Sequence, residues 1–177
     1  QSFLTRLFLL QQLVTKKYLV NIIYKEVFML LDIAKAEVKG GSKYPRIKGI
    51  VNFRQTSKGV LITAKIYNLP TTIGKCNKRI FGFHIHEGTS CCGNDKDEFA
   101  DTLAHYNPGN CNHPHHAGDL PPLFENKGYA YMNFLTDRFT LKEIIGRTVV
   151  IHSMPDDFTS QPSGNSGEKI ACGVIKR

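Results

Sequence analysis

Two histidines, His84 and His86, lie one residue apart in the stretch FGFHIHEG, residues 81–88. Side chains alternate between the two faces of a β-strand, so both imidazoles are expected on one face. The other face is apolar and is expected to pack on the core; it comprises Phe81, Phe83 and Ile85. Gly82 leaves room beside the histidines. Because neutral imidazole is the commonest protein ligand for copper and zinc, the pair indicates a metal site rather than two ordinary polar histidines.

A second group of candidate ligands follows in AHYNPGNCNHPHHAGD, residues 104–119. All seven histidines fall between residues 84 and 152, and five lie in or beside this insertion: His86, His105, His113, His115 and His116. Three histidines together with Asp119, which follows a glycine turn, would make a closed four-coordinate zinc site. A His-rich loop that binds metal loosely is the alternative. A further histidine, His152, lies far downstream in VVIHS and favours a specific metal site over loose binding by the loop.

These ligands need a rigid scaffold, and the composition predicts a mostly β domain. The chain has 177 residues, of which 41% are hydrophobic and 21% charged, as in a single globular domain. Short β-like runs separated by turn residues suggest a sandwich or barrel: residues 47–55, 59–70, 79–87, 129–140, 146–153 and 168–177. Two long insertions, residues 88–127 and 153–167, interrupt them and are expected to be functional.

The first 28 residues are apolar but carry Arg6, Lys16, Lys17 and Lys25, so no uncharged run reaches the length that crosses a bilayer. We expect an N-terminal extension, helical or disordered, over residues 1–28 and the domain over residues 29–177; a membrane-surface helix is left open. No small-residue cleavage site typical of a signal peptide is visible, so a cytoplasmic location is expected. An exported, periplasmic or extracellular location remains the alternative.

Charge and cysteine usage narrow the functional classes. The net charge is +8, but lysine and arginine are scattered along the chain, so nucleic acid is not an expected partner. A positive surface would instead raise the arrival rate of small anions. Because the chain has five cysteines, at least one thiol lacks a disulfide partner within it. No C-x-x-C pair is present, which argues against a Cys-rich zinc ribbon.

Seven motifs in order, between about Gly49 and Ile175, resemble the Cu/Zn superoxide dismutase family: GIVNFRQ, GFHIHE, HYNP, HHAGDL, IIGRTVVIH, DD and GNSGEKIACGVI. The resemblance implies an eight-stranded antiparallel Greek-key β-barrel, an immunoglobulin-like sandwich whose two long loops hold metals on its outer surface. It also implies conversion of superoxide anion to dioxygen and hydrogen peroxide by copper redox cycling, with zinc in a structural role. Family members are often homodimers, so a homodimer is left open.

The same resemblance implies two ligand sets that share His105, which would bridge the metals and take up a proton for the departing peroxide. Copper would be held by His84, His86, His105 and His152, and zinc by His105, His113, His116 and Asp119. Asp156 would tie one copper ligand to one zinc ligand. Cys91 and Cys172 would form a disulfide between the metal loop and the last strand, with Cys92 as an alternative partner; Cys76 and Cys111 have no counterpart in the family.

The chain departs from the family pattern at two places. Lys169 stands where the family has an arginine that guides the superoxide anion. Lysine keeps the positive charge but lacks the planar guanidinium that donates two hydrogen bonds at once, so the anion is expected to be positioned less tightly. His113 and His116 are separated by only two residues, so His115 is expected to compete as a ligand and a copper-only dismutase is an alternative. The other alternative is a copper/zinc-binding carrier or chaperone-like barrel with little turnover.

Overall fold

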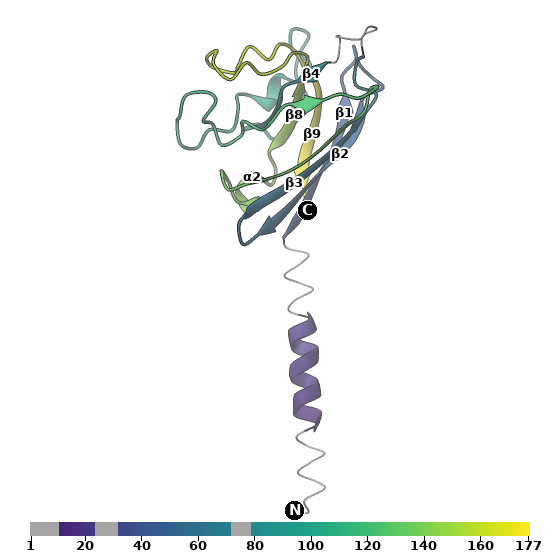
Figure 1. Ribbon diagram of the computed structural model, residues 1–177, viewed down its shortest axis with the longest axis vertical. Coiled ribbons are helices and arrows are strands. Elements are labelled where there is room, and N and C mark those ends of the chain that lie inside the picture. Colours follow the sequence, from purple (N-terminus) through teal and green to yellow (C-terminus); the bar gives the residue numbers. More distant parts are fainter. Residues whose placement is uncertain (1–10, 24–31, 72–78) are drawn as a thin grey trace, which may run out of the picture. The chain divides into compact units, whose positions relative to one another are not determined.

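The computed structural model describes residues 11–23, 32–71 and 79–177 (Figure 1). Contacts within the chain group it into two units, Gln1–Ile33 and Ala34–Arg177. In the first unit, residues 11–23 form a helix. The predicted boundary between residues 28 and 29 lies outside the described residues and stays a prediction. No helix within the described ranges combines the length and the apolar character needed to cross a membrane.

The second unit is an antiparallel β structure, as predicted. Seven strands form one curled sheet in the order β5-β8-β9-β1-β2-β3-β7, and β4 pairs with β6 beside it (Figure 1). The strands are β1 Ile33–Gly40, β2 Lys48–Thr56, β3 Gly59–Tyr67, β4 Ile80–Phe81, β5 Phe83–His86, β6 Leu123–Phe124, β7 Ala130–Thr136, β8 Thr148–His152 and β9 Lys169–Lys176. A 3₁₀ turn, η1 (Ala100–Thr102), and a short helix, α2 (Leu141–Ile144), complete the elements. This curled antiparallel architecture confirms the predicted all-β, barrel-like class, with nine short strands in the described residues where eight were expected.

The sheet forms because apolar and polar residues alternate along its strands. In β2, Val51 and Phe53 are fully buried while their neighbours are exposed, and β1 and β3 follow the same period of two. The predicted inward residues Phe81, Phe83 and Ile85 lie in this core, which confirms the face assigned to them. Truncating a buried phenylalanine such as Phe53 to alanine would cost about 3–5 kcal/mol of stability, because a cavity would remain.

Strands β5 and β8 differ from the others because every residue in them is buried. One face packs on the core, and the long connections between β5 and β6 and between β8 and β9 supply the partners of the other face. These connections correspond to the two insertions predicted to be functional. Gly82 permits this covering, since a Cβ there would lie 2.9 Å from Cβ of Ser166 and 3.2 Å from Cβ of His152. The predicted role of Gly82 in leaving room is therefore confirmed.

Candidate metal centre

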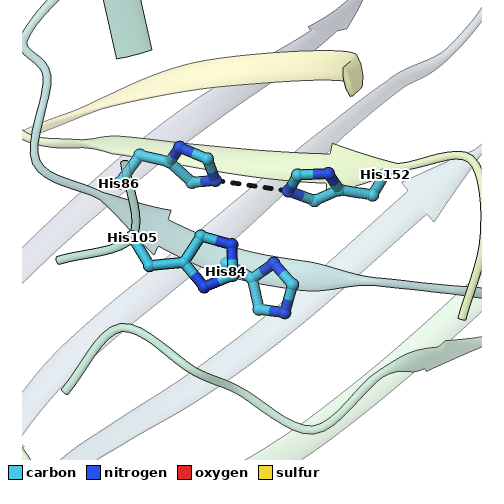
Figure 2. Close-up of side chains that lie close together, drawn as sticks. All are labelled: His84, His86, His105 and His152. Carbon is cyan, nitrogen blue, oxygen red and sulfur yellow. Dashed lines mark hydrogen bonds between the residues drawn. The ribbon is translucent and has the colours of Figure 1, made fainter. Parts of the chain in front are cut away.

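Four histidines converge under the loops, and we call them the histidine cluster: His84, His86, His105 and His152 (Figure 2). One ring nitrogen from each lies within 4.8 Å of the others, and all four side chains are buried. β5 contributes two of them on one face, as its alternation predicts, and β8 contributes its last residue. The fourth, His105, comes from the loop between β5 and β6 and is held against β5 by a β-bridge to His86.

A second group, the mixed cluster, consists of His105, His113, His116 and Asp119. Its donor atoms also lie within 4.8 Å of one another, and it shares His105 with the histidine cluster. Asp119 Oδ1 lies 2.7 Å from His105 Nδ1, and Oδ2 lies 3.1 Å from His113 Nδ1. The structure thus brings together all seven predicted ligands as two sets joined through one ring.

The short link between His113 and His116 does not prevent them from meeting. Their side chains are buried, whereas His115 between them is exposed and belongs to neither cluster. The expected competition from His115 is therefore not supported by the geometry. One side chain that sequence reasoning missed accounts for the path of this segment: Arg138 Nη1 donates hydrogen bonds to the carbonyls of Pro114, His116 and Asp119 at 3.0–3.2 Å.

Asp156 connects the two clusters. Its Oδ2 accepts a hydrogen bond of 2.7 Å from His84 Nε2, and its Oδ1 accepts one of 2.8 Å from His113 Nε2 and another of 2.7 Å from the Phe158 amide. Burial alone would raise the pKa of this carboxyl, but these hydrogen bonds, led by that of His84, lower it to about 2. Asp156 is therefore an anion that orients one ring of each cluster, as the family resemblance implies.

Neighbouring groups also fix the orientation of the remaining rings. His86 Nδ1 donates to the Leu103 carbonyl at 2.9 Å, and His152 Nδ1 donates to the Gly167 carbonyl at 3.3 Å. Each ring is left with Nε2 facing the cluster, where the two Nε2 atoms lie 3.2 Å apart (Figure 2). Burial, as the largest cause, lowers the pKa of both rings well below the ordinary value, so they are neutral at pH 7.

The donor atoms at the cluster centres fit metal ions. Among the residues that the structure describes, four buried ring nitrogens have no hydrogen-bond partner: His84 Nδ1, His105 Nε2, His113 Nδ1 and His116 Nδ1. Unpaired buried polar atoms are costly, and a metal bond would satisfy each of them. Four neutral imidazoles suit copper, and three imidazoles with one carboxylate suit tetrahedral zinc. The donor chemistry therefore fits one ion in each cluster.

A disulfide fastens the loop to the sheet. Cys91 and Cys172, 81 residues apart, are bonded as the resemblance implied, so Cys92 does not take the place of Cys91. Cys92 and Cys111 are exposed and free within the described ranges, and Cys76 lies outside them. The bond joins the loop after β5 to β9 and packs with Phe99 and Val150 in a small cluster separate from the main core.

Lys169 lies beside the histidine cluster, since it is the register partner of His152 across β8 and β9. Its side chain is 16% exposed, and its ammonium donates to Asp97 Oδ2 at 2.8 Å and to the Phe99 carbonyl at 3.1 Å. The predicted anion-steering charge is thus paired with a carboxylate that sequence reasoning did not single out. Neither Asp97 nor Arg138 stands in a recognisable motif, so only the folded chain reveals them.

Comparison with known proteins agrees with this geometry. The copper/zinc superoxide dismutase (SODC) family model matches residues 47–175. The chain is 37% identical over 137 residues to superoxide dismutase [Cu-Zn] 1 of Aquifex aeolicus (strain VF5), covering 69% of this chain and 76% of that protein. It is 35% identical over 164 residues to superoxide dismutase [Cu-Zn] of Legionella pneumophila, covering 88% and 94%.

The fold agrees as well. The solved structure of the Cu/Zn superoxide dismutase from Brucella abortus superimposes with a TM-score of 0.70 at 26% identity, covering 82% of this chain and 100% of that one. The family match, over residues 47–175, includes the segment that carries the two clusters. The chain therefore belongs to the copper/zinc superoxide dismutase family.

Proposed function

We propose that this protein is a superoxide dismutase that converts two superoxide anions into dioxygen and hydrogen peroxide. The observation that carries the proposal is the single buried ring, His105, shared by two complete donor sets. The histidine cluster would hold copper and the mixed cluster would hold zinc. When bound, copper would supply the one-electron redox cycle that the reaction needs.

The residues of the chain have distinct tasks in this proposal. Asp119 and Asp156 would orient the rings that face the zinc and copper positions. In the described part of the chain, Nε2 of His105 has no protein partner, so it would be free to carry one of the protons that peroxide requires. Lys169 would attract the substrate anion, although Asp97 offsets part of its charge.

The proposal is tested by loading the chain with copper and zinc, measuring the metal content by mass spectrometry and following superoxide consumption on the same sample. One copper and one zinc per chain with fast turnover are expected. The His152→Ala variant should lose turnover while it keeps zinc. Two bound metals without turnover would favour the carrier alternative, and turnover with copper alone would show that the mixed cluster is dispensable.

We further propose that the protein works in an oxidising compartment. The bond between Cys91 and Cys172 favours such a setting, since thiols are kept reduced in most cytosols. The cytoplasmic location expected from the sequence is the alternative, and trapping of free thiols in intact cells would distinguish the two. Full reduction of this pair in the native cell would contradict the proposal. The homodimer also stays a prediction, to be tested by light scattering.

A further inference from the structure

The outer face of four neighbouring strands gathers basic side chains that are far apart in the sequence. β9, β1, β2 and β3 lie side by side (Figure 1). Exposed residues alternate with core residues on β1, β2 and β3, whereas β9 is mostly buried and exposes Lys176 at its end. The exposed basic residues on this face are Lys35, Lys39, Lys48, Arg54, Lys65 and Lys176. Glu37 is the one carboxylate on these four described strands, and it is paired with Lys35 at 2.8 Å. Folding therefore gathers scattered lysines and one arginine on a surface where they outnumber the single carboxylate of these strands, and we call this surface the basic face.

The basic face also exposes apolar side chains between its lysines. A groove of about 340 Å³ crosses β1, β2 and β3 and is lined by Lys39, Lys48, Lys65, Ile50 and Tyr67, among others. Ile50 is 44% exposed and Tyr67 is 46% exposed. Cations beside exposed aliphatic and tyrosine side chains match the boundary between lipid headgroups and acyl chains. A soluble polyanion would contact only the lysines and the arginine, so the exposed apolar side chains favour a lipid surface.

The helix of residues 11–23 presents the same combination independently. Its only charged residues are Lys16 and Lys17. Its exposed large apolar side chains are Leu13, Val14, Tyr18, Leu19, Val20, Ile22 and Ile23. A helix of this length is marginal in water by itself and gains stability by burying its apolar side chains. A lipid interface would bury them and attract both lysines.

We propose that this protein binds the surface of an anionic lipid bilayer, with the basic face as the electrostatic contact and the helix as the apolar contact. The proposal is separate from the metal centre, because the predicted metal ligands lie on β5, β8 and their loops and none lies on this face. Each lysine near an anionic membrane strengthens binding about fivefold, so several act together.

The test is co-sedimentation of the full-length chain with vesicles of phosphatidylcholine alone or mixed with phosphatidylserine. Binding is expected only with phosphatidylserine, and it should weaken as salt is added. The pair Lys48→Glu with Lys65→Glu should weaken binding at least about 25-fold, since two contacts of about fivefold each are lost. The matched control, Lys58→Glu with Lys142→Glu, changes the net charge equally in a turn and on α2 and should have a much smaller effect.

A third variant, Leu19→Asp with Ile22→Asp, tests the apolar contact and should also weaken binding. The proposal is wrong if the Lys48/Lys65 variant or the Leu19/Ile22 variant binds vesicles as tightly as the Lys58/Lys142 control. It is also wrong if vesicles of phosphatidylcholine alone bind the protein as well as those with phosphatidylserine. Retention on heparin without vesicle binding would instead indicate a soluble polyanion. Superoxide consumption in solution at high salt, where long-range attraction of the anion is screened, should be the same in all these variants, which separates this test from that of the catalytic proposal.

Discussion

The metal-free protein is expected to lose stability on mild acidification. His84 is fully buried, and its burial, as the largest cause, lowers its pKa from 6.5 to about 4 against the opposing hydrogen bond to Asp156. In the unfolded chain the same ring takes up a proton near pH 6.5. Between these two values the unfolded state binds more protons than the folded state, so the free energy of unfolding falls as the pH falls.

The size of this effect follows from the two pKa values. For His84 alone, lowering the pH from about 6.5 to about 5 reduces the free energy of unfolding by roughly 1.5 kcal/mol. Burial lowers the pKa of His86 and His152 in the same direction, so the total loss is larger. Because a domain has only about 5–15 kcal/mol in all, this loss is a substantial share of the stability of the metal-free protein.

Urea unfolding of the chelator-treated chain, followed by circular dichroism across this pH range, measures the loss directly. His115→Gln is the matched control, since that ring is exposed and lies outside both clusters, and it should leave the pH dependence unchanged. Loading with metal should move the loss to lower pH, because the bound ion holds the rings neutral. An unfolding free energy that stays constant between about pH 6.5 and about pH 5 would refute the argument.

Three further predictions concern the residues around the clusters. Arg138→Gln should weaken zinc binding about 10- to 100-fold in a chelator competition, because the segment around His116 loses the hydrogen bonds that Arg138 donates to its carbonyls. Unchanged affinity would show that the segment keeps its conformation without Arg138. Asp97→Asn should raise kcat/KM by a few-fold at low salt and less at high salt, since the charge of Lys169 is no longer offset; a rate independent of this change would mean that Lys169 does not steer. Removing the disulfide by Cys172→Ser should cost about 4 kcal/mol in urea unfolding, because an 81-residue separation is no longer closed; a loss below about 1 kcal/mol would contradict the entropic account.

The candidate ligands were predictable from the sequence because the pattern that marks them is local. The spacing of His84 and His86 indicates that both lie on one face of a strand. The loop around His113 has several candidate metal-binding side chains within a few residues. The core residue Phe83 follows from the same alternation. These features depend on short-range periodicity, which can be seen in the sequence without knowledge of the fold.

The features that were not predictable depend on contacts between distant segments. Arg138 follows β7 but reaches the loop around residue 116, and Asp97 meets Lys169 across 72 residues. The basic face has the same origin, because Lys39, Lys48 and Lys65 become neighbours only when β1, β2 and β3 pair. Spacing along the chain carries no signal for any of these contacts.

The carboxylate of Asp156 has a thermodynamic consequence for how the two clusters fill. Because it accepts from Nε2 of both His84 and His113, it keeps both rings in the same tautomer, with Nδ1 as the free lone pair. An ion that orders either ring also orders Asp156 and hence the other ring. If copper and zinc fill the two clusters as proposed, we expect their binding to be cooperative, and the factor by which zinc tightens copper binding would equal the factor by which copper tightens zinc binding.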